Sequence, residues 1–226
     1  MITTINDDCL AFLKSDLCES LFNNRKVIIV TDPPFNIGYR YNTYKDRLKE
    51  NEYLDWLNEI FTGKSYEGLV IIHYPETLYK IAARINSFPE RVVSWVYNSN
   101  TSKQHRDIVF FGVKPDFKKV RQPYKNLNDK RIQERIARGC TGAKLYDWWN
   151  INQVKNVSKE KTNHPCQMPL EVMKNIIGIL PDDAIIFDPF TGSGTTAVAC
   201  KELNRDFVGC ELDKEYYEIA CERIKE

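Results

Sequence analysis

The stretch Ala184-Ile-Ile-Phe-Asp188-Pro-Phe-Thr-Gly192-Ser-Gly194-Thr-Thr196 decides the fold of this 226-residue chain. A short apolar run, typical of a buried strand, passes into a glycine-rich turn, and a helical pattern follows at residues 195–203. In open α/β sheets, ligands bind where strands end, because a glycine turn and a helix N-terminus offer unpaired N–H donors there. This stretch therefore predicts a parallel sheet with a ligand site at its carboxyl edge.

The same alternation of apolar runs and helical segments extends over most of the chain and predicts an α/β fold. Seven strands are expected, at residues 2–6, 27–31, 69–73, 92–97, 108–113, 184–187 and 207–211. Helices are expected at residues 9–21, 50–61, 76–88, 170–180, 195–203 and 214–225. The pattern indicates a mostly parallel seven-stranded sheet with helices on both faces.

A nucleoside pocket is indicated by the strand that follows the glycine turn. This strand ends at Glu211, 17 positions after Gly194, where an acidic side chain can bind ribose hydroxyls. Ala197 occupies the place of the third glycine in the dinucleotide motif, which favours a single nucleoside over a dinucleotide. The glycine turn at residues 192–194 is not followed by Lys-Ser/Thr, and Gly63-Lys64-Ser65 lacks the earlier glycine of a P-loop, since Asn58 stands at that position, so a P-loop is not indicated.

A second apolar strand, at residues 27–31, ends in Asp32-Pro33-Pro34-Phe35. The two prolines lack an N–H and restrict their neighbours, so they can hold a carboxylate and a backbone carbonyl in fixed positions. Two such acceptors can receive both hydrogen bonds of one planar NH2 group, while Phe35 stacks on the ring that bears it. The tetrapeptide alone can also be an ordinary strand-ending turn, but a nucleoside pocket beside it favours the chemical role.

Composition excludes several classes of protein. Hydrophobic residues make up 42% of the chain and charged residues 28%, which argues against disorder and collagen-like assemblies. No apolar run approaches the roughly 20 residues that cross a bilayer, and no leader pattern begins the chain. We therefore expect a cytoplasmic protein without membrane contact. Seven scattered cysteines without a Cys-x-x-Cys pair, and three distant histidines, predict neither a disulfide framework nor a metal site.

A basic stretch stands out although the formal net charge is only +1. Residues 114–138 hold nine basic and three acidic side chains, and the strand and helix periodicity fails over residues 114–163. Because that segment is too long for an ordinary connection, we interpret it as an inserted recognition element, with a solvated loop as the alternative. The side chains expected to contact phosphates are Lys118, Lys119, Arg121, Lys125, Lys130, Arg131, Arg135 and Arg138.

Together these motifs resemble those of DNA amino-methyltransferases. Asp32-Pro-Pro-Phe35 is similar to the family's catalytic Asp-Pro-Pro-Tyr/Phe motif, and Asp188-Pro-Phe-Thr-Gly-Ser-Gly194 is similar to its S-adenosylmethionine loop. Because the catalytic motif comes first, the order resembles the permuted β class. Further similar segments are Asp8-Cys9-Leu10, Trp95 with residues 108–114, Trp148-Trp149-Asn-Ile and His164-Pro-Cys-Gln-Met-Pro169. Met168 departs from the family's usual lysine, and Phe35 from its commoner tyrosine.

The resemblance implies a Rossmann-like class I methyltransferase fold with a circularly permuted motif order. Residues 1–113 would form the catalytic half of the core, 114–163 the inserted target-recognition region, and 164–226 the cofactor-binding half. The implied cofactor is S-adenosyl-L-methionine, and the implied partner is double-stranded DNA, with no metal ion. A homodimer and a cognate restriction endonuclease are left open as further partners.

The resemblance also assigns residues to the site. Asp32, Pro33, Pro34 and Phe35 would be catalytic. The cofactor would contact Asp8, Cys9, Asp32, His164, Gln167, Asp188, Phe190, Gly192, Ser193, Gly194, Thr195 and Glu211. Asp8 would accept from the cofactor adenine, and it can cap the helix near Cys9 at the same time. His164 and Gln167 would close the methionine end, or they would only order the turn at residues 165–169.

We therefore expect site-specific methylation of the N6 amine of adenine in duplex DNA, by base flipping. Cytosine N4 methylation is the nearest alternative, but the family more often pairs a leading Ser with cytosine and a leading Asp with adenine. RNA and protein-amide methyltransferases are less favoured, since those relatives usually have Asn-Pro-Pro and place the cofactor loop first. A nucleotide-binding module without catalysis would require Asp32 to be only a turn residue.

Overall fold

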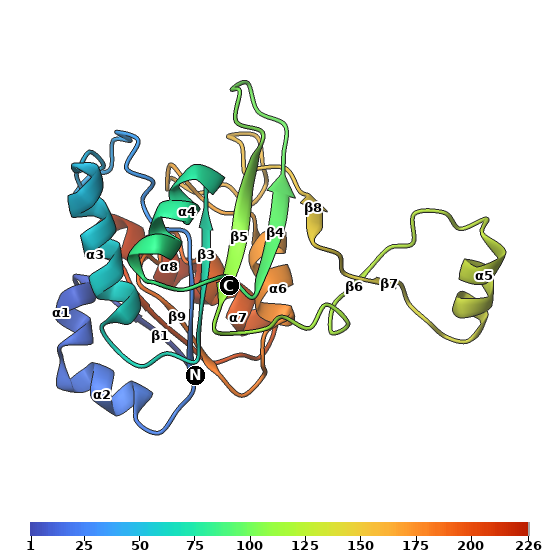
Figure 1. Ribbon diagram of the computed structural model, residues 1–226, viewed down its shortest axis with the longest axis horizontal. Coiled ribbons are helices and arrows are strands. Elements are labelled where there is room, and N and C mark those ends of the chain that lie inside the picture. The colour runs from blue at the N-terminus through green and yellow to red at the C-terminus, as the bar shows by residue number, and fades with distance from the viewer. Residues whose placement is uncertain (226) are drawn as a thin grey trace.

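A mixed sheet of eight strands forms the centre of the computed structural model, which describes residues 1–225 (Figure 1). Its strands are β1 (Ile2–Ile5), β2 (Val27–Thr31), β3 (Gly68–His73), β4 (Arg91–Val96), β5 (His105–Phe111), β8 (Trp148–Asn150), β9 (Ile185–Asp188) and β10 (Phe207–Cys210). In the order β1-β10-β9-β2-β3-β5-β4-β8, the first five strands are parallel. β5 alone runs antiparallel to its neighbours in this sheet.

The sheet has one strand more than the seven expected. β8 pairs in parallel with β4, with Trp149 opposite Trp95, and the Trp149 side chain is buried. Three residues are too few to show the alternation that marks a strand in the sequence. The region expected to be an insertion, residues 114–163, therefore returns to the core at its end. Two more short strands, β6 (Arg121–Gln122) and β7 (Ala143–Lys144), pair with each other outside the main sheet.

Helices cover both faces of the sheet. The covering helices are α1 (Cys9–Leu13), α2 (Asp16–Phe22), α3 (Glu50–Thr62), α4 (Pro75–Arg84), α6 (Leu170–Gly178), α7 (Thr195–Glu202) and α8 (Lys214–Lys225), whereas α5 (Lys130–Ala137) lies apart from the sheet. The single helix expected over residues 9–21 is two helices, because the Ser15 side chain accepts from the Cys18 N–H and begins a new one. Within residues 1–225, none of these helices has the length and apolar character needed to cross a membrane.

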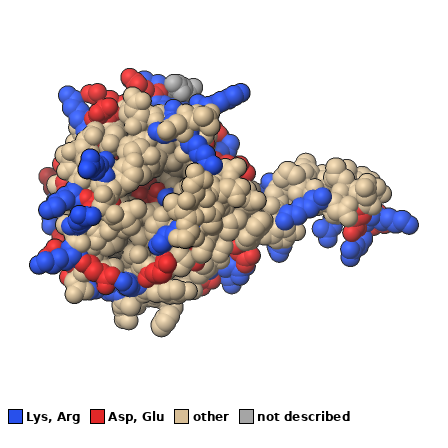
Figure 2. Space-filling model, turned by 90° about the horizontal axis from the view of Figure 1, so that it is seen from above, with Lys and Arg blue, Asp and Glu red and all other residues tan. Residues whose placement is uncertain are grey.

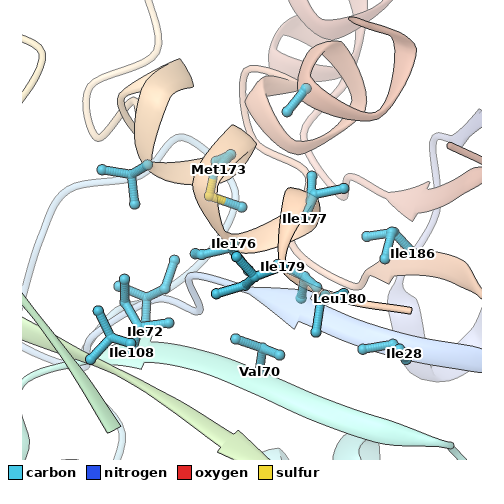
Figure 3. Packing of buried hydrophobic residues seen from close by; sticks show 14 of the residues in the cluster. Ile28, Val70, Ile72, Ile108, Met173, Ile176, Ile177, Ile179, Leu180 and Ile186 are labelled. Carbon is cyan, nitrogen blue, oxygen red and sulfur yellow. The ribbon is translucent and has the colours of Figure 1, made fainter. Parts of the chain in front are cut away.

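The central strands are buried on both faces, which explains their continuous apolar sequence. Ile28 and Val70 point to the face that α6 covers, where Ile176 packs above them (Figure 3). Ile29 and Ile71 belong to the opposite core, together with buried residues of α1, α3 and α4. This two-sided packing gives the strand ends a rigid base.

The carboxyl ends of the parallel strands meet at one edge of the sheet. Asp32 follows β2, Asp188 ends β9 and Glu211 follows β10. Asp8 comes shortly after β1. Because β5 is antiparallel, its N-terminal residues, Arg106 among them, reach the same edge. Residues from distant parts of the chain therefore converge there.

The chain between β5 and β8 leaves the body as an arm, which carries α5 at its outer end (Figure 1). No residue of α5 is buried. Figure 2 shows the arm projecting from the body with Lys and Arg side chains at its tip. We refer to residues 118–147 as the arm.

Candidate active site

A cavity of about 240 Å³ lies at the carboxyl edge of the sheet. All four residues of the Asp32–Phe35 tetrapeptide line it. Ten of the twelve residues expected to contact a cofactor also line it: Asp8, Cys9, Asp32, His164, Asp188, Phe190, Gly192, Ser193, Thr195 and Glu211. The two halves of the chain thus contribute to one site.

Asp188 holds the glycine-rich turn in place. Its Oδ1 accepts hydrogen bonds from the Thr31 hydroxyl at 2.8 Å and the Phe190 N–H at 3.1 Å, and its Oδ2 accepts from the Thr196 hydroxyl at 2.6 Å. Burial raises the pKa of Asp188, while these donors act in the opposite direction. The carboxylate therefore ties β9 to β2 and α7, and it shapes the cavity wall.

The two glycines of the turn serve different contacts. Gly192 has φ +53°, and a Cβ there would lie 3.1 Å from Nε2 of His164. Gly194 has φ +81°, and a Cβ there would lie 2.8 Å from Cβ of Ala220 in α8. Gly192 thus allows the turn to approach His164 at the cavity. Gly194, expected to contact the cofactor, lies outside the cavity lining and allows α7 and α8 to pack closely.

Two carboxylates border the far end of the cavity. Glu211 accepts from the Gly192 N–H at 2.7 Å through Oε2 and from the Asp213 N–H at 2.9 Å through Oε1. Burial raises the pKa of Glu211. Asp8 caps α1, since its Oδ1 accepts from the N–H groups of Leu10 and Ala11, and it lines the cavity as well. Capping and access to the cavity are therefore compatible for Asp8.

His164 and Gln167 have separate roles. His164 is buried at the cavity, and its Nδ1 has no hydrogen-bond partner within residues 1–225. Burial lowers the pKa of His164 to about 4, so the ring is neutral. Gln167 lies outside the cavity lining, because its amide accepts from the Thr162 N–H and donates to the Glu160 carbonyl. Gln167 thus orders the segment at residues 160–162, whereas its two expected roles were to close the methionine end or to order the turn at residues 165–169.

Asp32 is a partly buried residue whose Oδ1 is a buried and unused acceptor. Its Oδ1 has no hydrogen-bond partner among the described residues, and its Oδ2 lies 3.9 Å from Nη1 of Arg106. Burial raises the pKa of Asp32 to about 7, against the lowering effect of the Arg106 charge. A buried acceptor without a donor is costly to the fold. Such an atom at a cavity wall is suited to an N–H group supplied by a ligand.

Tyr53 and His73, which the sequence analysis missed, hold the Asp32–Phe35 tetrapeptide through hydrogen bonds. The Tyr53 hydroxyl donates to the Pro34 carbonyl at 2.7 Å and lies 3.1 Å from Nε2 of His73. His73 Nδ1 accepts from the Tyr74 N–H at 2.8 Å, so Nε2 carries the proton and donates to Tyr53. Burial lowers the pKa of His73 to about 3, which keeps the ring neutral. This chain of hydrogen bonds fixes the backbone beside Asp32.

Arg106 is a further cavity residue that the sequence analysis missed. Its guanidinium carbon lies 4.5 Å from the centroid of the Phe35 ring and 5.3 Å from that of Trp95. The only sequence signal was its position just before the apolar strand expected at residues 108–113. A charge at the start of a buried strand is also common at a sheet edge, so that signal was not distinctive.

The loop after the tetrapeptide covers the cavity. Asp46 is buried and accepts from the N–H groups of Asn36, Ile37 and Tyr39. At the loop's tip, the Thr43 hydroxyl donates to Asp213, close to the start of α8. Aromatic side chains from the loop that line the cavity are Tyr39, Tyr41 and Tyr44.

All eight basic residues expected to contact phosphates are exposed: Lys118, Lys119, Arg121, Lys125, Lys130, Arg131, Arg135 and Arg138. Lys119 differs, because its Nζ donates to the Leu180 carbonyl at 2.5 Å and to Asp182 at 2.6 Å. Its ammonium group therefore ties the base of the arm to the core. Lys119 thus has two partners within the protein, and its expected phosphate contact stays a prediction.

Comparisons with known proteins match nearly the whole chain. Residues 27–222 match the N6/N4 methyltransferase family model, described as DNA methylase. Type II methyltransferase M.HpaI of Haemophilus parainfluenzae is 30% identical over 91% of this chain and 70% of its own length. M.BglII of Bacillus subtilis is 31% identical over 88% of this chain, which spans 63% of that protein. DNA adenine methyltransferase YhdJ of Escherichia coli strain K12 is 27% identical over 98% of this chain and 82% of its own length.

Solved structures match over the same extent. The crystal structure of an M1.HpyAVI–SAM complex superposes with a TM-score of 0.67 at 27% identity, covering 100% of both chains. The cytosine-N4-specific PvuII DNA methyltransferase gives a TM-score of 0.68 at 18% identity, over 97% of this chain and 85% of its own. The second match shows likeness of fold alone, and it agrees with the class I methyltransferase fold expected from the sequence.

Proposed function

This chain belongs to the DNA methylase family, and from that premise we propose that it methylates the N6 amine of adenine in duplex DNA. The observation that carries the proposal is the buried Oδ1 of Asp32, a residue that lines the cavity, because this oxygen has no donor within residues 1–225. S-adenosylmethionine is the cofactor, and it supplies an electrophilic methyl group on a sulfonium. The residues that line the cavity fit this cofactor.

The proposed cofactor contacts follow from the atoms that border the cavity. Glu211 binds the ribose hydroxyls, since a carboxylate at the end of this strand is placed for them. Asp8 accepts from the adenine amino group through Oδ2, because its capping bonds use Oδ1. The unpartnered Nδ1 of the neutral His164 accepts or donates at the methionine end, according to its tautomer.

Asp32 and its neighbours prepare the target amine. An exocyclic amine is a poor nucleophile because its lone pair is delocalised into the ring. When the Asp32 carboxylate and the Pro33 carbonyl accept its two N–H bonds, the nitrogen can pyramidalise and direct its lone pair at the methyl group. A carboxyl group with a pKa raised to about 7 can also take up the proton that the amine loses. Positioning and charge placement thus carry the rate, without a covalent enzyme intermediate.

The target base must leave the duplex, because its amine is inaccessible inside the stack. Flipping costs a few kcal/mol, which stacking on Phe35 and contacts to the DNA backbone offset. We assign the phosphate contacts to the exposed basic side chains of the arm, and target recognition to residues 114–163. The exposed position of α5 supports this assignment.

Adenine is favoured over cytosine by the leading Asp of the tetrapeptide and by the name of the adenine-specific relative YhdJ. The type II names of M.HpaI and M.BglII support a restriction-modification setting with a cognate endonuclease. A homodimer and a cytoplasmic location stay predictions from the sequence. Cytosine N4 methylation is the second outcome that the experiment below separates.

The test incubates the purified protein and methyl-labelled S-adenosylmethionine with duplex DNA, RNA or protein. Labelled nucleic acid is then digested, and the modified nucleoside is identified. Label in N6-methyladenine from duplex DNA is the expected result. Label in N4-methylcytosine would replace the proposed target base, and label only in RNA or protein would contradict the proposal. The Asp32→Ala variant is the control, since its cofactor pocket is otherwise intact.

A further inference from the structure

Arg106 is held in an aromatic cage beside the tetrapeptide. Its guanidinium carbon lies 4.5 Å from the Phe35 ring centroid, 5.3 Å from that of Trp95, and 5.8 Å from those of Tyr74 and Tyr97. These distances lie within the range of cation–π attraction. A planar cation thus lies over the Phe35 ring at the cavity wall.

Among the groups that lie against the Phe35 ring, Arg106 is one that lines the cavity. The His73 ring centroid lies 4.2 Å from that of Phe35, but His73 is fully buried and does not line the cavity. Arg106 does line it. A base that enters the cavity and stacks on Phe35 therefore needs the space that the guanidinium fills.

Arg106 also resembles the target base in its polar contacts. It presents N–H groups towards Asp32, with Nη1 3.9 Å from Oδ2. Its attachment is weak for a buried cation, because Nε has no hydrogen-bond partner within residues 1–225 and Nη1 donates to the thioether of Met168 at 3.7 Å. Because these polar contacts are few, the contacts with the aromatic rings are the main barrier to its departure.

We propose that Arg106 is a placeholder for the target base, stacking on Phe35 and facing Asp32 until the flipped base displaces it. The proposal rests on the proposed function, since it takes Phe35 as the ring on which the base stacks. Arg106 is thus a positioning residue. Before the base enters, its guanidinium fills the base pocket and its charge pairs with the Asp32 carboxylate. Because the base must displace it, Arg106 also adds a free-energy cost to base entry.

The test compares two duplexes that differ only at the target position, one with adenine and one with an abasic site. Their sequence is the one found methylated by the wild-type protein. Dissociation constants are measured by fluorescence anisotropy with S-adenosylhomocysteine present, at about pH 9, where Asp32 is ionised. We divide the dissociation constant for the abasic duplex by that for the adenine duplex. Changes in binding to the DNA backbone affect both constants equally and cancel, so the ratio reports base entry alone.

Arg106→Met is expected to raise this ratio by about threefold to tenfold over wild type, since the base no longer displaces a stacked cation. Arg106→Lys keeps the charge beside Asp32 but loses the planar group, so a smaller rise is expected. The matched control is Arg91→Met, because Arg91 also lies over an aromatic ring, that of Phe117, and pairs with Asp147. Arg91 lies outside the cavity lining, and its variant should leave the ratio unchanged.

An unchanged or lower ratio in Arg106→Met would overturn the proposal, because a residue that binds the base directly would weaken base entry when lost. If the Met variant does not fold, the ratio of the Lys variant decides in the same way. Methyl transfer by the wild type on the same DNA separates the two claims. Transfer with an unmoved ratio refutes only the placeholder, whereas absence of transfer to any DNA refutes the proposed function.

Discussion

The cavity and the arm are built in opposite ways. Around the cavity, the polar side chains Asp46, Asp188 and His73 are buried and held by several hydrogen bonds. On the arm, α5 has no buried residue, and its basic side chains extend into solvent (Figure 2). A fixed cavity suits positioning of reacting atoms, while an exposed arm suits contacts that need charge more than geometry. Variants of the cavity should therefore lose methyl transfer or cofactor binding, whereas variants of the arm should lose DNA affinity.

The largest effect is expected for Asp32→Ala. Loss of an acceptor for the target amine should lower the single-turnover methyl-transfer rate on the order of a hundredfold to a thousandfold. Cofactor affinity should stay close to wild type, as measured by calorimetry, because Asp32 lies at the amine end of the cavity. A variant that keeps more than a tenth of the wild-type rate would exclude Asp32 from this role.

Glu211→Ala should act on the cofactor instead. A buried hydrogen bond to a charged group contributes about 1.5–3 kcal/mol, so the dissociation constant for S-adenosylmethionine should rise about tenfold to a hundredfold. Glu222→Ala is the matched control, since Glu222 is exposed on α8. Equal affinities of the two variants in calorimetry would remove Glu211 from the cofactor site.

The arm should respond through salt dependence. Replacing Lys130, Arg135 and Arg138 with Gln should weaken binding to every DNA sequence and lower the logarithmic salt slope by about 0.9 for each lost phosphate contact. Lys119→Gln is the control, because its ammonium group is bound to Leu180 and Asp182, and its slope should not change. An unchanged slope in the triple variant would show that these three basic residues form only a solvated surface.

The smallest effect concerns stability. The pKa of Asp32 is raised from 3.8 to about 7, so the folded state keeps a proton that the unfolded state loses, and stability falls as pH rises between these values. Asp32→Asn removes this penalty. Its melting temperature should exceed that of wild type by a few degrees at about pH 8, with a smaller difference at about pH 5. A difference in melting temperature that does not change with pH would mean that the pKa of Asp32 is not raised in the folded state.

The sequence predicted the strand ends well, because buried parallel strands are continuous apolar runs and their polar endings share one edge. Asp32, Asp188 and Glu211 were found in this way. Arg106 and Tyr53 were not, since their roles depend on how β5 and α3 pack against the tetrapeptide. That packing leaves no local pattern in the chain.

The contacts that Gly194, Gln167 and Lys119 make within the protein were not predicted for the same reason. Gly194 and Gln167 stand in the right motifs, but their neighbours in space are α8 and the turn at residues 160–162. Lys119 stands in the basic stretch, yet its partners are more than 60 positions away. Long-range contacts of this kind decide whether a motif residue faces a ligand or the protein itself.

The most direct test of the division between cavity and arm measures two quantities on the same variants, Asp32→Ala and the triple arm variant. One is the dissociation constant for cognate DNA, and the other is the single-turnover methyl-transfer rate with DNA and cofactor saturating. We predict that Asp32→Ala binds DNA normally and transfers poorly, whereas the arm variant binds poorly and regains the wild-type rate at saturation. An arm variant that stays slow at saturation, or an Asp32 variant that reacts normally, would contradict this account.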